Sequence, residues 1–118
     1  MKKFLAVYTG TPESVERKGW NKLSDAERQK RQQTGIKAWQ QWAETNKAHI
    51  VDSGSPLGKT KCVSGRGIED IRNNLAAYVI VQADSPEAAA RLFENHPHFT
   101  IFPGDTVEIM ECLPIPGT

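Results

Sequence analysis

Cysteine is scarce in this chain, and its scarcity argues against a zinc scaffold and a disulfide framework. Only Cys62 and Cys112 are present, and their spacing matches no zinc-binding or CxxC pattern. The two can pair if their strands are neighbours, but we expect two buried free thiols in a reducing cytoplasm. A chain of 118 residues can bury a modest core, so folding requires neither a metal nor a disulfide. We expect no metal site and no cofactor.

Long apolar runs and an excess of charge are also missing. The start, Met1–Tyr8, is similar to a signal peptide, but its apolar run is too short and Thr9–Glu13 ends it. No stretch is long enough to span a membrane. The formal net charge of +1 gives no reason to expect a nucleic-acid partner. We therefore expect a cytoplasmic protein that binds neither membranes nor nucleic acids.

Motifs for nucleophilic catalysis and phosphate binding are missing as well. The chain has no Ser/His/Asp order and no nucleotide fingerprint, and Gly65-Arg66-Gly67 lacks the flanking strand, helix and third glycine of a phosphate cradle. It also has no internal repeat and no linker. Residues 1–118 are therefore expected to form a single domain.

The clearest structural signal is a strand, a helix and a strand between residues 74 and 113. Ala76–Ala83 is rich in branched and aromatic residues and predicts a central strand. Ser85 can cap a helix that begins at Pro86 and ends before Pro97. Thr106–Cys112 then predicts a further strand.

The N-terminal half predicts a strand followed by a long helix. Lys3–Thr9 alternates, with Leu5 and Val7 on one face and Phe4, Ala6 and Tyr8 on the other. Turn residues predict a loop over Gly10–Ser14. Ser24-Asp-Ala-Glu27 matches a capping box, and the helix it starts should reach Asn46 or Lys47. Gly35 within that helix indicates close packing on the sheet, or close approach of a loop or ligand.

The middle of the chain has weaker signals. Ala48–Asp52 is a possible strand, Ser53–Gly58 reads as a loop, and Lys59–Ser64 suggests a second or edge strand followed by a hairpin turn or bulge. The order of elements predicts an antiparallel split β-α-β sheet with both helices on one face. The other face needs a cover, for which a second copy of the chain, in a homodimer, is the simplest choice.

Several short motifs resemble the YCII-related family. The matching features are a tyrosine-containing strand, Ala83-Asp-Ser-Pro-Glu-Ala-Ala89, Asn95-His-Pro-His98, Gly104, and Val107-Glu-Ile109. The resemblance implies a ferredoxin-like α+β domain paired as a dimeric α+β barrel, and it implies little about activity. Family members thought to be enzymes pair an aspartate with a histidine early on the long helix. This chain has Gln32–Lys37 there without a histidine, and the DGPF signature of one branch is also missing.

Three residues are candidates for catalysis. His96 and His98 flank Pro97, and either imidazole can serve as a general acid or base. The alternative is that His96 closes the preceding helix by bonding a free carbonyl while His98 packs in a loop. Asp52 is either a catalytic carboxylate or an acceptor of backbone hydrogen bonds in the following turn.

Four residues are candidates for ligand binding. Arg66 can anchor an anionic group or lie exposed in its loop. Trp39 lines a ligand cleft or belongs to the core, and Tyr8 and Tyr78 can place hydroxyls in a cleft. The leading hypothesis is a homodimeric small-molecule-binding or accessory domain, with an anionic or aromatic ligand. The alternatives are a lyase- or isomerase-like enzyme that uses His/Asp acid–base chemistry, and a protein that only assembles.

Overall fold

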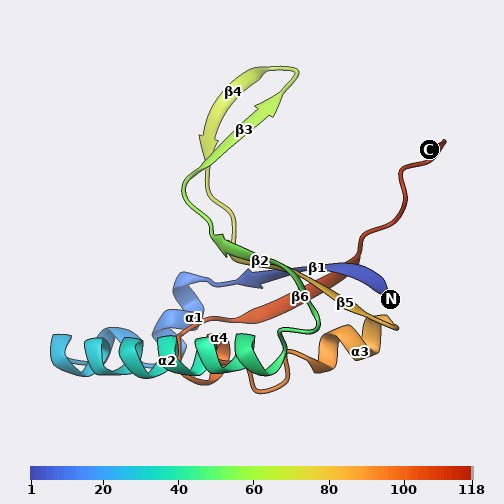
Figure 1. Ribbon diagram of the computed structural model, residues 1–118. Coiled ribbons are helices and arrows are strands. Elements are labelled where there is room, and N and C mark those ends of the chain that lie inside the picture. The colour runs from blue at the N-terminus through green and yellow to red at the C-terminus, as the bar shows by residue number, and fades with distance from the viewer. Residues whose placement is uncertain (118) are drawn as a thin grey trace.

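A computed structural model describes residues 1–117 of the chain. It contains six strands, four α-helices and one 3₁₀ turn (Figure 1). The strands are β1 (Lys2–Thr9), β2 (Ile50–Pro56), β3 (Thr60–Ser64), β4 (Gly67–Ile71), β5 (Leu75–Ala83) and β6 (Thr106–Glu111). The helices are α1 (Pro12–Arg17), the 3₁₀ turn η1 (Trp20–Lys22), α2 (Asp25–Thr45), α3 (Pro86–Arg91) and α4 (Pro97–Thr100).

Four strands form the main sheet in the order β2-β5-β1-β6, and every neighbouring pair is antiparallel. In Figure 1 the helices lie on one side of this sheet. The predicted α+β class and the split β-α-β arrangement are therefore confirmed. Strands β1 and β5 are central, and their alternation decides which side chains meet the helices.

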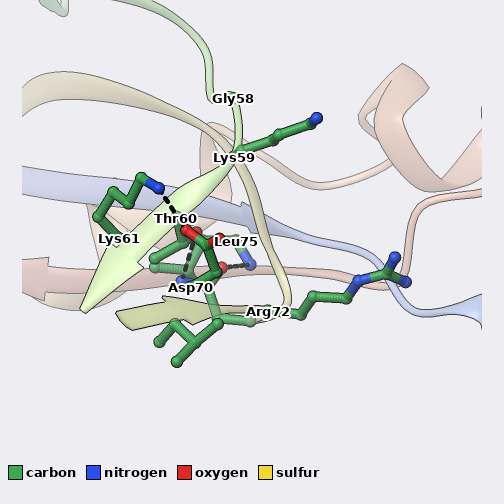
Figure 2. A pocket seen from close by; sticks show the side chains of 9 residues that line it. Gly58, Lys59, Thr60, Lys61, Asp70, Arg72 and Leu75 are labelled. Carbon is green, nitrogen blue, oxygen red and sulfur yellow. Dashed lines mark hydrogen bonds and ion pairs between the residues drawn. The ribbon is translucent and has the colours of Figure 1, made fainter. Parts of the chain in front are cut away.

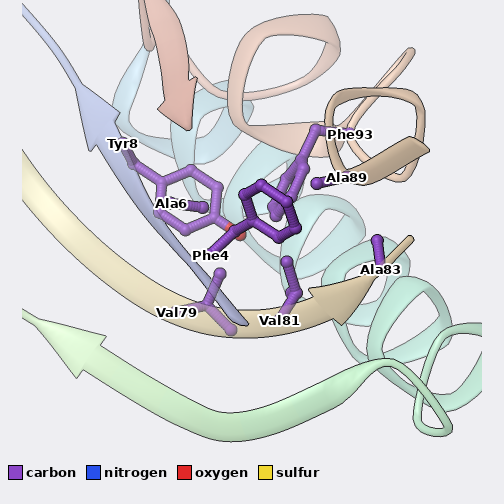
Figure 3. Close-up of a cluster of buried hydrophobic side chains, with 8 residues drawn as sticks. All are labelled: Phe4, Ala6, Tyr8, Val79, Val81, Ala83, Ala89 and Phe93. Atoms are coloured by element: carbon purple, nitrogen blue, oxygen red, sulfur yellow. The ribbon is translucent and has the colours of Figure 1, made fainter. Parts of the chain in front are cut away.

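The core lies between the sheet and the helices (Figure 3). Phe4 pairs with Val81 and Ala6 with Val79 across the β1–β5 ladder, and all four side chains are buried against Phe93 of the segment after α3. The intervening residues, such as Leu5 opposite Ile80, belong to the other face. The alternation expected for the first strand is thus confirmed.

Local capping starts the helices. Ser24 and Glu27 form the predicted capping box of α2, which ends at Thr45, and Ser85 accepts a hydrogen bond from the Ala88 backbone at the start of α3. The loop prediction for residues 10–14 is wrong, because Thr11 and Ser14 form a second capping box and Pro12 begins α1. Thr11 caps the backbone and Pro12 fits the first helical position, so this segment forms a helix and not an open turn.

The segment between α2 and β5 differs most from the prediction. β2 continues through the expected loop to Pro56, with irregular pairing around Gly54, whose φ is 66°. A Cβ atom built on Gly54 would overlap the carbonyl oxygen of Tyr78, so the backbones of β2 and β5 approach too closely there for a side chain. The strand can cross this turn-rich sequence because glycine occupies the strained position.

β3 and β4 pair only with each other and form a hairpin that projects from the main sheet. The predicted strand over residues 59–64 therefore belongs to a separate ribbon, and the turn at Gly65–Gly67 is a hairpin turn as expected. The radius of gyration is 16.3 Å, above the roughly 13–14 Å of a compact domain of this length. In Figure 1 the hairpin rises on the side opposite the helices.

Neither cysteine forms a disulfide within the described chain. Cys62 is half-buried in β3 and Cys112 is exposed after β6. The expectation of free thiols fits this arrangement, but the expectation that both are buried is wrong, because β3 is in the projecting hairpin and Cys112 follows the last strand. No helix within residues 1–117 is long and apolar enough to cross a membrane.

Candidate functional site

A cleft of about 530 Å³ lies between α2 and the β2–β5 edge of the main sheet. Its volume falls within the range typical of small-molecule sites. Most of its lining is aromatic or aliphatic, with serine, glutamine and histidine as the polar members, and none of the lining residues is charged. The principal side chains of its walls are Tyr8, Trp39, Trp42, His98 and Phe102.

Two tryptophans of α2 form one wall of the cleft in different ways. The indole N–H of Trp42 donates a 2.7 Å hydrogen bond to the Leu92 carbonyl, which ties α2 to the segment after α3. The indole N–H of Trp39 has no acceptor among the described residues, and its ring centroid is 4.9 Å from that of Tyr8. Trp42 is therefore anchored in the fold, whereas Trp39 has a polar group to offer to a ligand.

Phe102 closes the same side of the cleft because Gly35 leaves room for it. A Cβ atom on Gly35 would overlap the Phe102 ring, so the mid-helix glycine allows the close approach of a loop residue. Of the alternatives given for Gly35 from the sequence, close approach of a loop is therefore the one that the structure shows. The Phe102 and Trp39 rings have centroids 6.1 Å apart and meet edge to face.

His96 is fully buried beneath the cleft wall and cannot reach a ligand. Its Nδ1 accepts a 3.0 Å hydrogen bond from the His98 backbone N–H, which caps α4, and its Nε2 lies 3.3 Å from the Tyr8 hydroxyl. Since Nδ1 must be an acceptor, a neutral His96 donates from Nε2 to that hydroxyl. This histidine begins α4 instead of closing α3, and its complete burial argues against the predicted catalytic role, which stays a prediction.

His98 lines the cleft, and its ring orientation is set by two backbone features. Its Nε2 lies 2.7 Å from the carbonyl oxygen of Thr9, and Gly104 has no Cβ that would overlap the imidazole ring. A carbonyl can only accept, so Nε2 carries the proton and Nδ1 of a neutral His98 keeps a lone pair. No donor in residues 1–117 makes a hydrogen bond to that Nδ1.

Burial keeps the titratable groups of this region uncharged at neutral pH. Desolvation lowers the pKa of His96 to about 3, with a smaller contribution from His98. Desolvation also lowers the pKa of His98, opposed in part by its hydrogen bond to Thr9. The pKa of the Tyr8 hydroxyl is raised by the same burial. The His98 imidazole and the Tyr8 phenol are therefore both neutral.

Of the remaining predicted residues, Asp52 and Arg66 do not line the cleft, and Tyr78 lies at its border. Asp52 is exposed and accepts a 2.8 Å hydrogen bond from the Gly54 N–H, as the turn-type alternative expects, and it is not among the cleft-lining residues. Arg66 is exposed in the hairpin turn, away from the cleft lining. Tyr78 borders the cleft, but it pairs with Val7, so strand alternation puts its hydroxyl on the opposite face from Tyr8.

A second hollow, of about 670 Å³, lies at the base of the hairpin (Figure 2). Lys61 and Asp70 form an ion pair across β3 and β4, and Lys59 and Arg72 extend away from that pair in Figure 2. All four residues are exposed, so their charges are solvated. Although this hollow is larger than the cleft, it contains no buried polar group aimed at a ligand.

Sequence reasoning missed three contributors to the cleft. Phe102 lies in an irregular loop, Thr9 contributes only its carbonyl oxygen, and Gly104 contributes only the absence of a side chain. The mid-helix Gly35 was the one available signal, because it indicated close approach at that level of α2. No three His, Cys, Asp or Glu side chains within residues 1–117 are grouped to hold a metal ion.

Comparison with known proteins supports the fold. A scan against models of protein families gives no match, and a search of curated proteins gives none either. Among solved structures, the chain is similar to 5-chloro-2-hydroxyhydroquinone dehydrochlorinase from Burkholderia phenoliruptrix, solved in complex with 2,5-dihydroxybenzoquinone. The match has a TM-score of 0.52 and 18% identity, and it covers 92% of this chain and 90% of the other. At this identity the likeness establishes a shared α+β fold and nothing about chemistry.

Proposed function

We propose that the protein binds a small, uncharged, planar molecule in the cleft between α2 and the β2–β5 edge. The observation that carries this proposal is the lining itself, which has aromatic walls from Trp39, Trp42 and Phe102 and no charged side chain. An anionic ligand, one of the two options from the sequence, would meet no cation there, since Arg66 is in the hairpin turn. Flat aromatic walls favour a ligand with its own π-face.

The ligand of the similar structure is consistent with this class. 2,5-Dihydroxybenzoquinone is a planar, oxygen-substituted ring bound by a protein of the same fold. For the present chain, the fold and the short motifs also support a YCII-related origin, which we propose here. A cytoplasmic location remains our expectation for a protein with one exposed thiol.

The cleft proposal is tested by titrating neutral monocyclic aromatics while recording the NMR signals of the three indole N–H groups. We expect the Trp39 signal to shift most, because its indole N–H has no protein acceptor, and the Trp42 signal to shift less. Trp20 does not line the cleft, and its ring centroid is 6.4 Å from that of Phe102, so Trp20→Phe, which keeps an aromatic ring there, is the matched control and should leave binding unchanged. The proposal fails if no neutral aromatic in the set shifts the Trp39 signal.

We also propose that two copies of the chain pair through the open face of the main sheet. Strand alternation puts Leu5, Val7, Tyr78, Ile80 and Met110 on that face, away from the helices. Met110 is 46% exposed in the single chain, Leu5, Tyr78 and Ile80 are half-buried, and Val7 at the centre of the strip is buried. A continuous apolar strip of this kind on an antiparallel sheet favours a partner.

Charge complementarity favours a second copy as that partner. Lys3 and Glu108 lie on the same open face, both are exposed, and neither forms an ion pair within residues 1–117. They are separated along β1, since Glu108 is opposite Val7. A two-fold axis through the face can therefore bring Lys3 of each copy near Glu108 of the other.

The hairpin gives a second reason to expect a partner. An isolated two-stranded ribbon is at best marginally stable in water. Val63 and Ile68 form a cross-strand pair near its tip and are 74% and 73% exposed. Since the hairpin rises on the open-face side, it can extend over a second copy seated there (Figure 1).

Enzymatic action remains the second candidate, and the position of His98 favours it. His98 is in the cleft with an unprotonated Nδ1, which is what a general base requires. Its partner in the described chain is the Thr9 backbone carbonyl, so we propose His98, without Asp52, as the acid–base group of such an enzyme. If the cleft is catalytic, the His98→Gln variant should bind ligand but lose catalysed proton exchange at a carbon of the bound molecule.

A further inference from the structure

We infer that the cleft selects aromatic rings bearing a hydroxyl group, a phenol or an enol, because His98 presents a fixed acceptor at Nδ1. This inference rests on the proposed binding function and names the chemical class of the ligand. It depends on which ring nitrogen carries the proton, and hydrogen-bond geometry decides that question. Two independent contacts around α4 fix the tautomers of both histidines.

The first contact is between His98 and the end of β1. The Thr9 carbonyl accepts from the Asp105 backbone N–H at 2.9 Å and lies 2.7 Å from Nε2 of His98. Because a carbonyl oxygen has two lone pairs and no proton, both of its neighbours donate to it. His98 therefore holds its proton on Nε2, and a neutral ring leaves Nδ1 as an acceptor.

The second contact involves His96 and decides which of its two ring nitrogens carries the proton. The His98 backbone N–H donates to Nδ1 of His96, which leaves Nε2 of His96 to donate to the Tyr8 hydroxyl. Both nitrogens of His96 are thus engaged inside the protein, and His96 is fully buried. His98 is then the imidazole that a ligand in the cleft can address.

The packing around His98 keeps this acceptor in place. Its ring lies against Gly104, where any side chain would overlap it, and its centroid is 5.1 Å from that of Tyr8 and 6.2 Å from that of Trp39. The ring cannot turn over without breaking the bond to Thr9. A ligand hydroxyl can donate to Nδ1, whereas an ether or unsubstituted ring would leave that buried acceptor without a partner.

Matched ligands test this without changing the protein. Phenol, anisole and toluene have similar rings, and phenol alone carries a donor. We expect calorimetry at neutral pH to show phenol binding to the wild-type protein about tenfold more tightly than anisole, with anisole similar to toluene. The ¹⁵N signal of His98 Nδ1 should shift with phenol and stay in place with anisole.

Variants of His98 distinguish a hydrogen bond to the ligand hydroxyl from simple packing against the ligand ring. His98→Phe should bind anisole and toluene as before and lose the preference for phenol, whereas His98→Gln, whose amide can donate to Thr9 and also accept, should keep part of it. Near-equal affinity of wild-type protein for phenol and anisole would overturn the inference and leave the cleft proposal intact. No binding of any of the three ligands would overturn both, and that result does not depend on whether a variant folds.

Discussion

The two faces of the main sheet have similar apolar residues and different surroundings. On one face, Phe4, Ala6 and Tyr8 of β1 are covered by helices and are buried almost completely. On the other, Leu5 and Ile80 lie opposite one another with no helix above them. The same strands therefore build a finished core on one side and an unfinished surface on the other. Substitutions on the first face should therefore change mainly the free energy of unfolding, and substitutions on the second should change mainly dimer formation.

The largest effect is expected on the covered face. Phe4→Ala removes a ring that is fully buried beside Val81 and Phe93, and we expect it to lower the free energy of unfolding by about 3–5 kcal/mol. Urea denaturation followed by circular dichroism measures this loss. Leu5→Ala, on the adjacent residue of the same strand, is the matched control and should cost the single chain much less. Equal losses from the two variants would contradict the contrast between the faces.

On the open face, Met110→Lys should act on assembly before stability. Its side chain is 46% exposed in the single chain, so a lysine can be solvated there, but a second copy packed on the face would bury the new charge. We expect sedimentation equilibrium to show a dimer for the wild-type chain and mainly a monomer for the variant. A monomeric wild-type protein would refute the pairing outright.

The proposed contact between Lys3 and Glu108 has a sharper test in a charge swap. Glu108→Lys alone should weaken the dimer about threefold to tenfold at low salt, since it places like charges together. Adding Lys3→Glu should restore most of that affinity. If the double variant is no better than Glu108→Lys, the two copies do not pair in the proposed register.

Beneath the covered face, His96 should make stability depend on pH. Its pKa falls from 6.5 in the unfolded chain to about 3 in the fold, so between these values the unfolded chain binds a proton that the folded chain does not. Stability is therefore full above pH 6.5 and declines as pH falls toward 3, with a limiting slope of about 1.4 kcal/mol per pH unit. The His96→Gln variant should lose this part of the slope, whereas His49→Gln should retain it.

The smallest effect is expected at the Tyr8 hydroxyl. Tyr8→Phe keeps the ring between Trp39 and Phe93 but removes the acceptor for His96 Nε2, and we expect a loss of about 0.5–1.5 kcal/mol in the free energy of unfolding. Thermal denaturation at neutral pH suffices to measure it. A gain in stability would mean that the 3.3 Å contact with His96 contributes nothing.

The covered face was largely predictable because its signals are local. Alternation in β1 and the capping residues Ser24 and Ser85 each act within a few positions, and the structure confirms them. The second strand of the hairpin, β4, was missed because it is exposed along its whole length and so has no burial pattern. The strand predicted for β2 ended too early, because the turn-rich residues that follow form a strand only by pairing with β5.

The candidate site was predictable only in part, because the sequence shows residue types and local signals but not tertiary contacts. Trp39, Tyr8 and His98 were singled out by residue type and all three line the cleft, although their roles in binding remain predictions. His96 and Asp52 were singled out on the same grounds and are used by the backbone, one at the start of α4 and the other in β2. Residue type identifies what chemistry is available, but only the tertiary fold decides which nitrogen or oxygen is left for a ligand.

The central claim is that the cleft between α2 and the β2–β5 edge holds a hydroxylated aromatic ring, and a crystal soaked in hydroquinone tests it most directly. We predict a planar ring beside Trp39 and Phe102, with one hydroxyl oxygen within hydrogen-bonding distance of His98 Nδ1. An empty cleft at saturating hydroquinone, or a ring bound only at the hairpin base near Lys59 and Arg72, would contradict the account.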